Sequence, residues 1–439
     1  MTSVSNLDIV EDPFIIRDVK ARMILDSRGN PTVQVRVVTE SYGVGVANAP
    51  SGASVGKHEA VELRDGGKEF FGKGVSRAVE SVNKVIGPAI IGVSALRQRY
   101  IDEKMIELDG TPNKSRLGGN AIVATSLAVA KAAASTLGVP LYVYLGGVYA
   151  DLLPVPMLNI INGGVHAGNK LDFQEFMIVP AGFNDFLDAL RASVEVYHAL
   201  RAILKENFEP SAVNVGDEGG FAPPLEKTRD ALNLLIKAIE KAGYEPGGQV
   251  ALAIDAAISR LYRADKGVYI VEGRELSREE LISMYEALVE EYPLVSIEDP
   301  LYEEDFEGFS ELTGRLGSKC LIVGDDLFTT NYKRVKLGIE KKSASAVLVK
   351  VNQAGTLTET LDVVKLAVES NLRAIISHRS GETEDTTIAD IAVALQTGLI
   401  KTGAPARGER TCKYNRLLEI YSELEKPRFP GFRVFPRKP

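Results

Sequence analysis

Short apolar runs in the second half of this chain each close on a polar or charged residue, at nearly even intervals. The closing residues are Asp255, Glu298, Asp325, Lys350, His378 and Lys401. Unbroken Val/Ile/Leu runs are typical of parallel strands that are buried on both faces. In a closed barrel of such strands, the active site lies at their carboxyl ends. The sequence therefore predicts a strand–helix barrel whose mouth carries carboxylates, lysines and a histidine.

The barrel region begins irregularly. Two strand-like runs at 156–161 and 173–179 are joined only by a loop, so we expect them to be antiparallel neighbours. Helical patterns follow at about 184–207 and 225–243, with no strand between them. Strand–helix alternation begins only after that, which gives an α/β order of β-β-α-α-(βα)6. The stretch 261–277 predicts a small hairpin inserted before the next helix.

The front of the chain predicts a separate α+β domain. Alternating apolar and polar residues at 19–27, 31–41 and 44–50 indicate a three-stranded meander, and helical periodicity follows it. A chain of 439 residues is long enough for two domains. We place the boundary near residue 150, with an N-terminal capping domain at 1–150 and a catalytic barrel at 151–439.

Composition excludes several classes of function. The net charge of −8 and the lack of a basic run argue against nucleic acid as a partner. No apolar run is long enough to predict a membrane span, and the first residues lack the pattern of a signal peptide. The cysteines, Cys320 and Cys412, cannot form a disulfide framework. We therefore expect a cytoplasmic protein.

Three carboxylates suggest a metal site. Asp255, Glu298 and Asp325 stand one per strand end, and Mg²⁺ prefers carboxylate oxygens as ligands. The plainer alternative for any one of them is helix N-capping. Because adjacent side chains on a strand point to opposite faces, we expect only one member of each doublet, Glu298/Asp299 and Asp325/Asp326, to face the centre.

Two lysines and a histidine complete the pattern. Burial and a second nearby cation should lower the pKa of Lys350 and Lys401, so that one of them could serve as a general base. Alternatively, both bind an anion or pair with the carboxylates. His378, followed by Arg379 and Ser380, suits phosphate binding, or it is an ordinary core histidine. Glu175, Glu218 and His166 would mean little alone.

Ten segments, in order and at consistent spacing from about residue 18 to about residue 420, identify a resemblance. They are DSRGNPTV (26–33), PSGAS (50–54), NIINGGVHAGN (159–169), QEFM (174–177), VGDEGGFAP (215–223), SIEDP (296–300), GDDL (324–327), VKVNQAGTLTET (349–360), SHRSGETED (377–385) and IKTGAPARGER (400–410). The chain resembles enolase, the phosphopyruvate hydratase family of glycolysis. The resemblance implies the enolase-type barrel with an N-terminal α+β domain.

The resemblance also implies roles. Asp255, Glu298 and Asp325 match the ligands of a first Mg²⁺, and Ser54 matches the residue that reaches a second Mg²⁺ arriving with the substrate, 2-phosphoglycerate. Lys350 matches the base that removes the C2 proton, and Glu218 matches the acid that protonates the leaving C3 hydroxyl, assisted by Glu175. The residues that match substrate contacts are His166, Gln174, His378, Arg379, Ser380 and Lys401.

Some features depart from the family pattern or stay open. Residues before Arg17 form an extension, Val55 replaces a common Thr, and Ser259-Arg260-Leu261 replaces a usual Ser-Glu-Phe. A sugar-acid or muconate-type substrate is the alternative reaction, and a surface receptor or scaffold role is the alternative class of function. The resemblance implies a homodimer or an assembly of dimers.

Overall fold

The first sheet of the molecule forms from alternating residues at the front of the chain. A computed structural model describes residues 12–52 and 56–439. Strands β1 (Ile16–Leu25), β2 (Pro31–Thr39) and β3 (Val44–Asn48) form an antiparallel meander in the order β1-β2-β3, which confirms the predicted three strands. Asp26 stabilises the first turn, because its Oδ1 accepts hydrogen bonds from the backbone N–H groups of Arg28 and Asn30.

Helices and helical turns follow this sheet in the chain. They are α1 (Ser76–Ser81), α2 (Gly87–Ile90), α3 (Gln98–Asp109), α4 (Gly119–Leu137) and α5 (Leu141–Gly146), with shorter helical turns η1 (Glu69–Gly72), η2 (Val82–Ile86) and η3 (Gly147–Tyr149). Helix α4 lies directly on β2 and β3. Its approach is so close that a Cβ at Gly45 would lie 1.9 Å from the carbonyl oxygen of Ala128. By length and composition α4 could span a bilayer, but 78% of it is buried inside the molecule.

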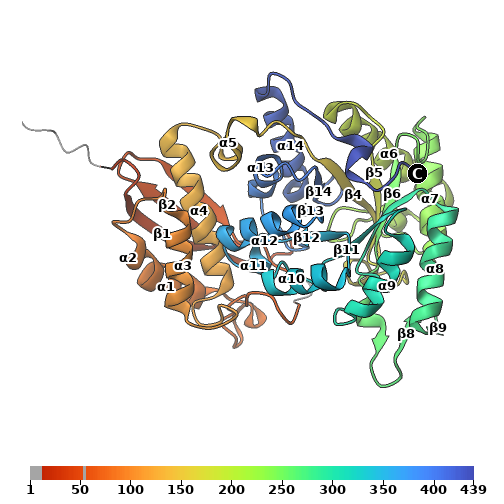
Figure 1. Ribbon diagram of the computed structural model, residues 1–439, viewed down its shortest axis with the longest axis horizontal. Coiled ribbons are helices and arrows are strands. Elements are labelled where there is room, and N and C mark those ends of the chain that lie inside the picture. The colour runs from red at the N-terminus through yellow and green to blue at the C-terminus, as the bar shows by residue number, and fades with distance from the viewer. Residues whose placement is uncertain (1–11, 53–55) are drawn as a thin grey trace, which may run out of the picture.

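Eight strands close into a barrel beyond this domain. They are β4 (Val155–Asn162), β5 (Glu175–Val179), β6 (Ala251–Asp255), β10 (Leu294–Glu298), β11 (Leu321–Gly324), β12 (Ala346–Val349), β13 (Arg373–Ser377) and β14 (Leu399–Lys401). Nearly every residue in them is buried, as the apolar runs predict. Figure 1 shows β1, β2 and α1–α4 gathered at one end of the long axis and the barrel towards the other.

The barrel helices follow the predicted order. Two helices, α6 (Phe186–Asn207) and α7 (Thr228–Lys241), with the turn η5 (Pro210–Val213) between them, separate β5 from β6. The later helices are α8 (Arg278–Glu291), α9 (Phe306–Leu316), α10 (Tyr332–Lys341), α11 (Val351–Ala354), α12 (Leu357–Glu369), α13 (Thr387–Ala394) and α14 (Gly408–Glu423), and the remaining turns are η4 (Gly164–His166), η6 (Ile258–Leu261) and η7 (Gly431–Val434). The β-β-α-α-(βα)6 prediction is confirmed.

Strand β5 runs against its neighbours. It pairs antiparallel with both β4 and β6, and the other barrel pairs are parallel. Its first residue, Glu175, lies opposite Asp255, the last residue of β6. The reversal therefore brings the beginning of β5 to the mouth of the barrel, where its neighbours end.

The insertion after β6 differs from the prediction. It contains three strands, β7 (Tyr262–Arg263), β8 (Val268–Val271) and β9 (Arg274–Leu276), where the pattern predicts a single hairpin. The extra strand arises because Glu272 and Gly273 both adopt positive φ and make a second tight turn.

Candidate active site

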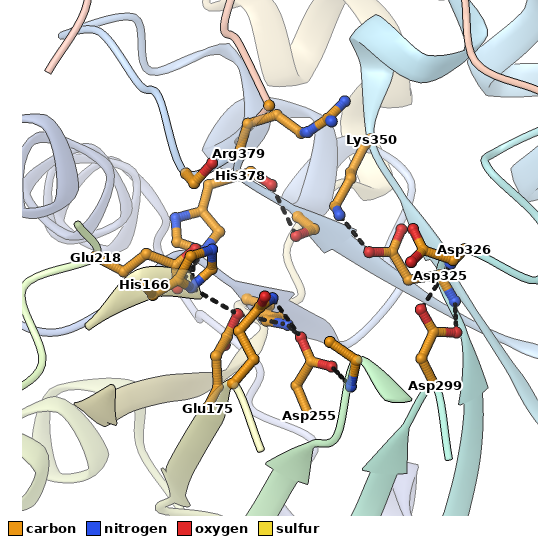
Figure 2. A pocket seen from close by; sticks show the side chains of 16 residues that line it. His166, Glu175, Glu218, Asp255, Asp299, Asp325, Asp326, Lys350, His378 and Arg379 are labelled. Atoms are coloured by element: carbon orange, nitrogen blue, oxygen red, sulfur yellow. Dashed lines mark hydrogen bonds and ion pairs between the residues drawn. The ribbon is translucent and has the colours of Figure 1, made fainter. Parts of the chain in front are cut away.

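A polar pocket lies at the mouth of the barrel, where the strand ends converge. Its lining includes eleven of the sequence-predicted residues, namely His166, Gln174, Glu175, Glu218, Asp255, Asp325, Lys350, His378, Arg379, Ser380 and Lys401 (Figure 2). Glu298 lies behind them and bonds to Lys401. Ser54 falls outside the described residues. Apart from Ser54, the structure brings every predicted site residue to one place.

Lys401 is the centre of the carboxylate cluster. Its Nζ lies 2.8 Å from both carboxylate oxygens of Glu298, 3.1 Å from Oδ2 of Asp255 and 3.2 Å from Oε1 of Glu175. Gln174, the residue before β5, reaches the same group, because its amide nitrogen lies 3.4 Å from Oδ2 of Asp255. The lysine ammonium therefore holds three strand ends together.

Lys350 occupies the opposite side of the carboxylates. Its ammonium bonds to Oδ2 of Asp325, and the other oxygen of Asp325 accepts a hydrogen bond from Gln353 at 3.1 Å. Figure 2 shows Lys350 on one side of the pocket and Glu218 with His166 on the other. A ligand between them would meet a lysine on one face and a carboxyl group on the other.

The predicted direction of the lysine pKa values is wrong for the protein without a metal. Burial alone would lower the pKa of Lys350, but the neighbouring carboxylates, Asp325 foremost and Glu298 as well, together raise it. Burial alone would also lower the pKa of Lys401, but Asp255, Glu175 and Glu298 together raise this pKa well above its ordinary value. A second cation nearby would lower the pKa of a lysine, but the fold also places carboxylates around Lys350 and Lys401, and these raise the pKa.

A second group of titratable side chains lies across the pocket. Ligand atoms of His166, Glu175 and Glu218 lie within 4.8 Å of one another. Burial and the neighbouring Glu218 raise the pKa of Glu175 well above its ordinary value. Burial also lowers the pKa of His166. Burial acts to raise the pKa of Glu218, but His378, His166 and Arg410 together lower it well below its ordinary value, so the proton that this pair retains lies on Glu175. A buried carboxyl group that keeps its proton is suited to acid catalysis.

His378 and Arg379 follow β13 and point into the site from its far side. His378 Nε2 lies 3.4 Å from Oε2 of Glu218, and burial lowers the pKa of His378 to about 4. The guanidinium of Arg379 donates to Glu59 at 2.8 Å and to Asn352 at 3.1 Å, and Glu59 belongs to the N-terminal domain. The front of the chain thus helps to hold an arginine of the barrel site.

The prediction that only one member of each acidic doublet faces the centre is wrong for Asp325 and Asp326, because both line the pocket. In the other doublet Asp299 lines the pocket, while Glu298 does not and bonds to Lys401. Strand β10 ends at Glu298, and Asp299 adopts φ +41°, so strand alternation no longer applies to it. Asp299 accepts hydrogen bonds from the backbone N–H groups of Asp325 and Asp326, at 2.9 and 2.7 Å, and so fixes the loop after β11.

The donor set suits a divalent cation. Seven carboxyl groups face three cationic side chains within the described part of the site; the acids are Glu175, Glu218, Asp255, Glu298, Asp299, Asp325 and Asp326, and the cations are Lys350, Arg379 and Lys401. Burial and carboxylate crowding raise the pKa of Glu298 well above its ordinary value, and that of Asp326 to about 7. A cation with oxygen ligands would relieve this crowding.

Several residues of the site were missed by the sequence analysis. Glu59, Asn159, Gln353 and Arg410 all bond to predicted site residues. Glu59 and Asn159 lie far along the chain from the residues they contact. Arg410 lies inside one of the matched segments, but no spacing rule connects it with His378.

Buried carboxylates at the mouth of a closed barrel, with lysines against them, define a class of protein: barrel enzymes that hold a divalent cation beside a general base. Comparison with known families is more specific. The family model "Enolase, C-terminal TIM barrel domain" matches residues 150–435, and "Enolase, N-terminal domain" matches residues 16–145. The chain belongs to the enolase family.

Individual relatives agree along almost the whole chain. The chain is 58% identical to an enolase of Thermococcus kodakarensis over 429 residues, which covers 98% of each chain. It is 58% identical to an enolase of Methanocaldococcus jannaschii over 422 residues, covering 96% of this chain and 98% of the relative. An enolase of Pyrococcus furiosus is 59% identical over 416 residues, covering 95% and 96%.

Proposed function

We propose that this protein catalyses the reversible dehydration of 2-phosphoglycerate to phosphoenolpyruvate, as a lyase of glycolysis and gluconeogenesis. The observation that carries the proposal is the placement of Lys350 across the pocket from Glu218, with Asp255 and Asp325 in the same lining and Glu298 bonded to Lys401 (Figure 2). An elimination needs a base at one carbon and an acid at the leaving group on the next carbon. Lys350 and Glu218, on opposite sides of the pocket, can serve as this base and this acid.

Lys350 is the residue we assign to the C2 proton. That proton is weakly acidic because its removal leaves a second negative charge beside the carboxylate of the substrate. Asp255, Glu298 and Asp325 would hold one magnesium ion, and the resemblance assigns Ser54 to a second ion that would bind with the substrate. Such ions would supply positive charge where this negative charge develops. Lys350 gives up its own proton more easily once Asp325 no longer bonds to it.

Glu218 and Glu175 act at the other end of the substrate. We assign Glu218 to protonation of the C3 hydroxyl and Glu175 to holding the proton beforehand, which its raised pKa supports. The remaining pocket residues would bind the substrate. Arg379 and Ser380 are suited to the phosphate and Lys401 to the carboxylate. The part of the substrate between these two groups would contact His166, Gln174 and His378.

The direct test follows phosphoenolpyruvate formation from 2-phosphoglycerate with Mg²⁺ and with a chelator. We expect turnover that requires the metal. Lys350→Ala should lower kcat by about 10³-fold or more, because general bases contribute roughly 10²–10⁴-fold. Lys365→Ala, on the exposed face of α12, is the matched control and should leave turnover unchanged.

Isotope exchange separates the base from the acid. Exchange of the C2 hydrogen with solvent should disappear in Lys350→Ala and persist in Glu218→Gln, since the second variant lacks only the acid. If the intact, folded protein gave no turnover with Mg²⁺, the proposal would fail and a sugar-acid substrate would be tested next.

We propose a homodimer or an assembly of dimers in the cytoplasm, with 1–150 and 151–439 as the two domains. The resemblance to the enolase family supports this proposal. Light scattering of the purified protein measures the assembly, and a monomer at micromolar concentration would contradict it.

A further inference from the structure

Arg410 is a completely buried cation behind the pocket, in the first turn of α14. Its guanidinium donates to Nδ1 of His378 at 2.6 Å and to the backbone carbonyl oxygens of Arg379, Ser380 and Asp217, at 2.6, 2.6 and 3.1 Å. The carboxylate it approaches, that of Glu409, lies 3.6 Å from Nε. Burying a charge that bonds mainly to neutral acceptors costs free energy. This cost indicates that the contacts of Arg410 have a role in the site.

The bond to Nδ1 determines where the proton of His378 lies. A guanidinium has five donors and no acceptor. Nδ1 must therefore accept, and the neutral imidazole must carry its proton on Nε2. Burial, reinforced by the charge of Arg410, keeps the ring neutral at physiological pH. The charged and titratable groups that face the ring are Glu218, Arg410 and Glu382.

The Nε2–H group points at Glu218. Nε2 lies 3.4 Å from Oε2 of Glu218, longer than an ordinary hydrogen bond, and it has no other hydrogen-bond partner among the described residues (Figure 2). Catalytic hydrogen bonds are often long in the absence of substrate and shorten in the complex. Arg410 also holds the carbonyl oxygen of Asp217, the residue before Glu218, so it fixes both partners of this contact.

We propose that Arg410 is a positioning residue that fixes the Nε2–H tautomer of His378, making this histidine a permanent hydrogen-bond donor to Glu218 rather than a carrier of protons. The inference rests on the proposed function only in treating Glu218 as the acid of the dehydration.

The two carboxylate oxygens of Glu218 then have different hydrogen-bond partners and different roles. Oε2 accepts from the amide of Asn159 at 3.0 Å and faces Nε2 of His378. Oε1 lies on the side of His166, whose Nδ1 is 3.6 Å from it and 3.9 Å from Oε1 of Glu175. Oε1 is therefore the oxygen left to receive a proton from the side of Glu175, whose own Oε1 lies 3.2 Å from Nζ of Lys401.

The tautomer can be observed directly in the full-length protein without substrate or metal. The chain has four histidines, so long-range ¹H–¹⁵N correlation spectra of ¹⁵N-histidine-labelled protein, assigned with His378→Gln, resolve each ring. We expect an unprotonated Nδ1 and a protonated Nε2 for His378, unchanged from pH 6 to 9. A protonated Nδ1, a mixture of tautomers or a titration in that range would overturn the proposal.

Arg410→Lys tests the cause. A lysine has fewer donors and no planar fork, so we expect loss of the fixed tautomer in a protein whose circular dichroism stays native. A folded variant that kept a pure Nε2–H ring would show that Arg410 is not responsible.

A pair of substitutions at His378 tests the consequence even if Arg410→Lys does not fold. The longer side chain of His378→Gln can place an amide N–H near the position of Nε2, and that of His378→Asn cannot. We expect kcat to fall about 10²-fold in the Asn variant, the scale of a misplaced catalytic group, and less than about tenfold in the Gln variant, with KM similar in both. Equal losses would overturn the donor role. A fixed tautomer in a wild-type protein that does not turn over 2-phosphoglycerate would refute the proposed function alone.

Discussion

At the scale of single residues, the charge state of each site group depends on its neighbours more than on its type. Lys350 and Lys401 hold their protons because carboxylates surround them, and Glu175 takes up a proton because Glu218 lies beside it in a buried place. The crowding of buried titratable groups that shifts these pKa values therefore also lowers the stability of the folded protein when no metal is bound.

Glu175→Gln tests this effect on stability. Because the folded-state pKa of Glu175 is raised above its unfolded value, ionisation of Glu175 favours the unfolded chain, and its contribution to stability falls as pH rises from the unfolded value through the raised one. In the presence of a chelator, we expect the variant to melt at a higher temperature than wild type at pH 8, with the difference shrinking towards pH 5. The kcat should fall about 10²-fold, because a proton carrier is lost. A variant less stable than wild type at pH 8 would contradict the assignment.

At the scale of elements, close packing decides which residues a helix or strand accepts. Gly45 of β3 lies against the backbone of α4, whereas Gly314 inside α9 has open space where a Cβ would stand. The two glycines share a residue type and differ only in their surroundings.

Alanine at each position should therefore act in opposite directions. Gly45→Ala should destabilise the protein by about 2 kcal/mol or more, since sheet and helix must separate. Gly314→Ala should stabilise it by about 0.5–1 kcal/mol, because alanine restricts the unfolded chain and favours helix. Denaturant melts of both variants measure the difference. Equal effects of one sign would show that the β3–α4 contact is looser than described.

At the scale of the whole molecule, the N-terminal domain grips the loop that carries Arg379 and Ser380. Ser51 and Gly381 exchange backbone hydrogen bonds at 2.7 and 2.8 Å, and Lys131 of α4 bonds to Asp385 at 2.9 Å. The loop after β13 is thus held from both domains.

Asp385→Asn tests the buried part of this contact. Burial acts to raise the pKa of Asp385, but Lys131 and Thr387 outweigh it and lower the pKa. A lowered folded-state pKa gives stability that is present above the unfolded pKa and is lost as pH falls through the folded one. We expect a loss of about 2 kcal/mol or more at pH 7, shrinking below about pH 4, with a raised KM. Asp362→Asn, which breaks the exposed pair with Arg99 across the same two domains, is the control and should cost less than about 1 kcal/mol.

Metal binding should stabilise the folded molecule as a whole. At about 100 times its Kd, a ligand that binds only the folded state adds roughly 2.7 kcal/mol. We expect Mg²⁺ to raise the melting temperature of wild type and of Asp326→Asn, because Asp326 has a pKa of about 7 and is a weak ligand near neutrality. The shift should vanish in Glu298→Gln. A shift lost in Asp326→Asn and kept in Glu298→Gln would place the metal among Asp299, Asp325 and Asp326 instead.

Much of the fold could be predicted from local patterns. Alternation predicted β1–β3, and unbroken apolar runs predicted the barrel strands, because both patterns record how a strand is buried. The sheet β7–β9 has one strand more than predicted because the chain turns at Glu272 and Gly273. Glu272 adopts positive φ there, and Gly273 is the single turn signal in the sequence at this position. The resemblance to enolase supplied the individual roles that no pattern could supply.

By itself, the sequence determined the order of the elements, the residues that close each strand and the family to which they belong, since these are properties of neighbouring residues and of spacing. The sequence also predicted that β5 runs antiparallel to β4. The tertiary structure alone decided that β5 pairs with β6 in the register that places Glu175 opposite Asp255, that Arg410 reaches His378, and that the lysines keep their protons. The reason is physical: electrostatic energy depends on distances between groups far apart in the chain, and those distances exist only once the barrel has closed.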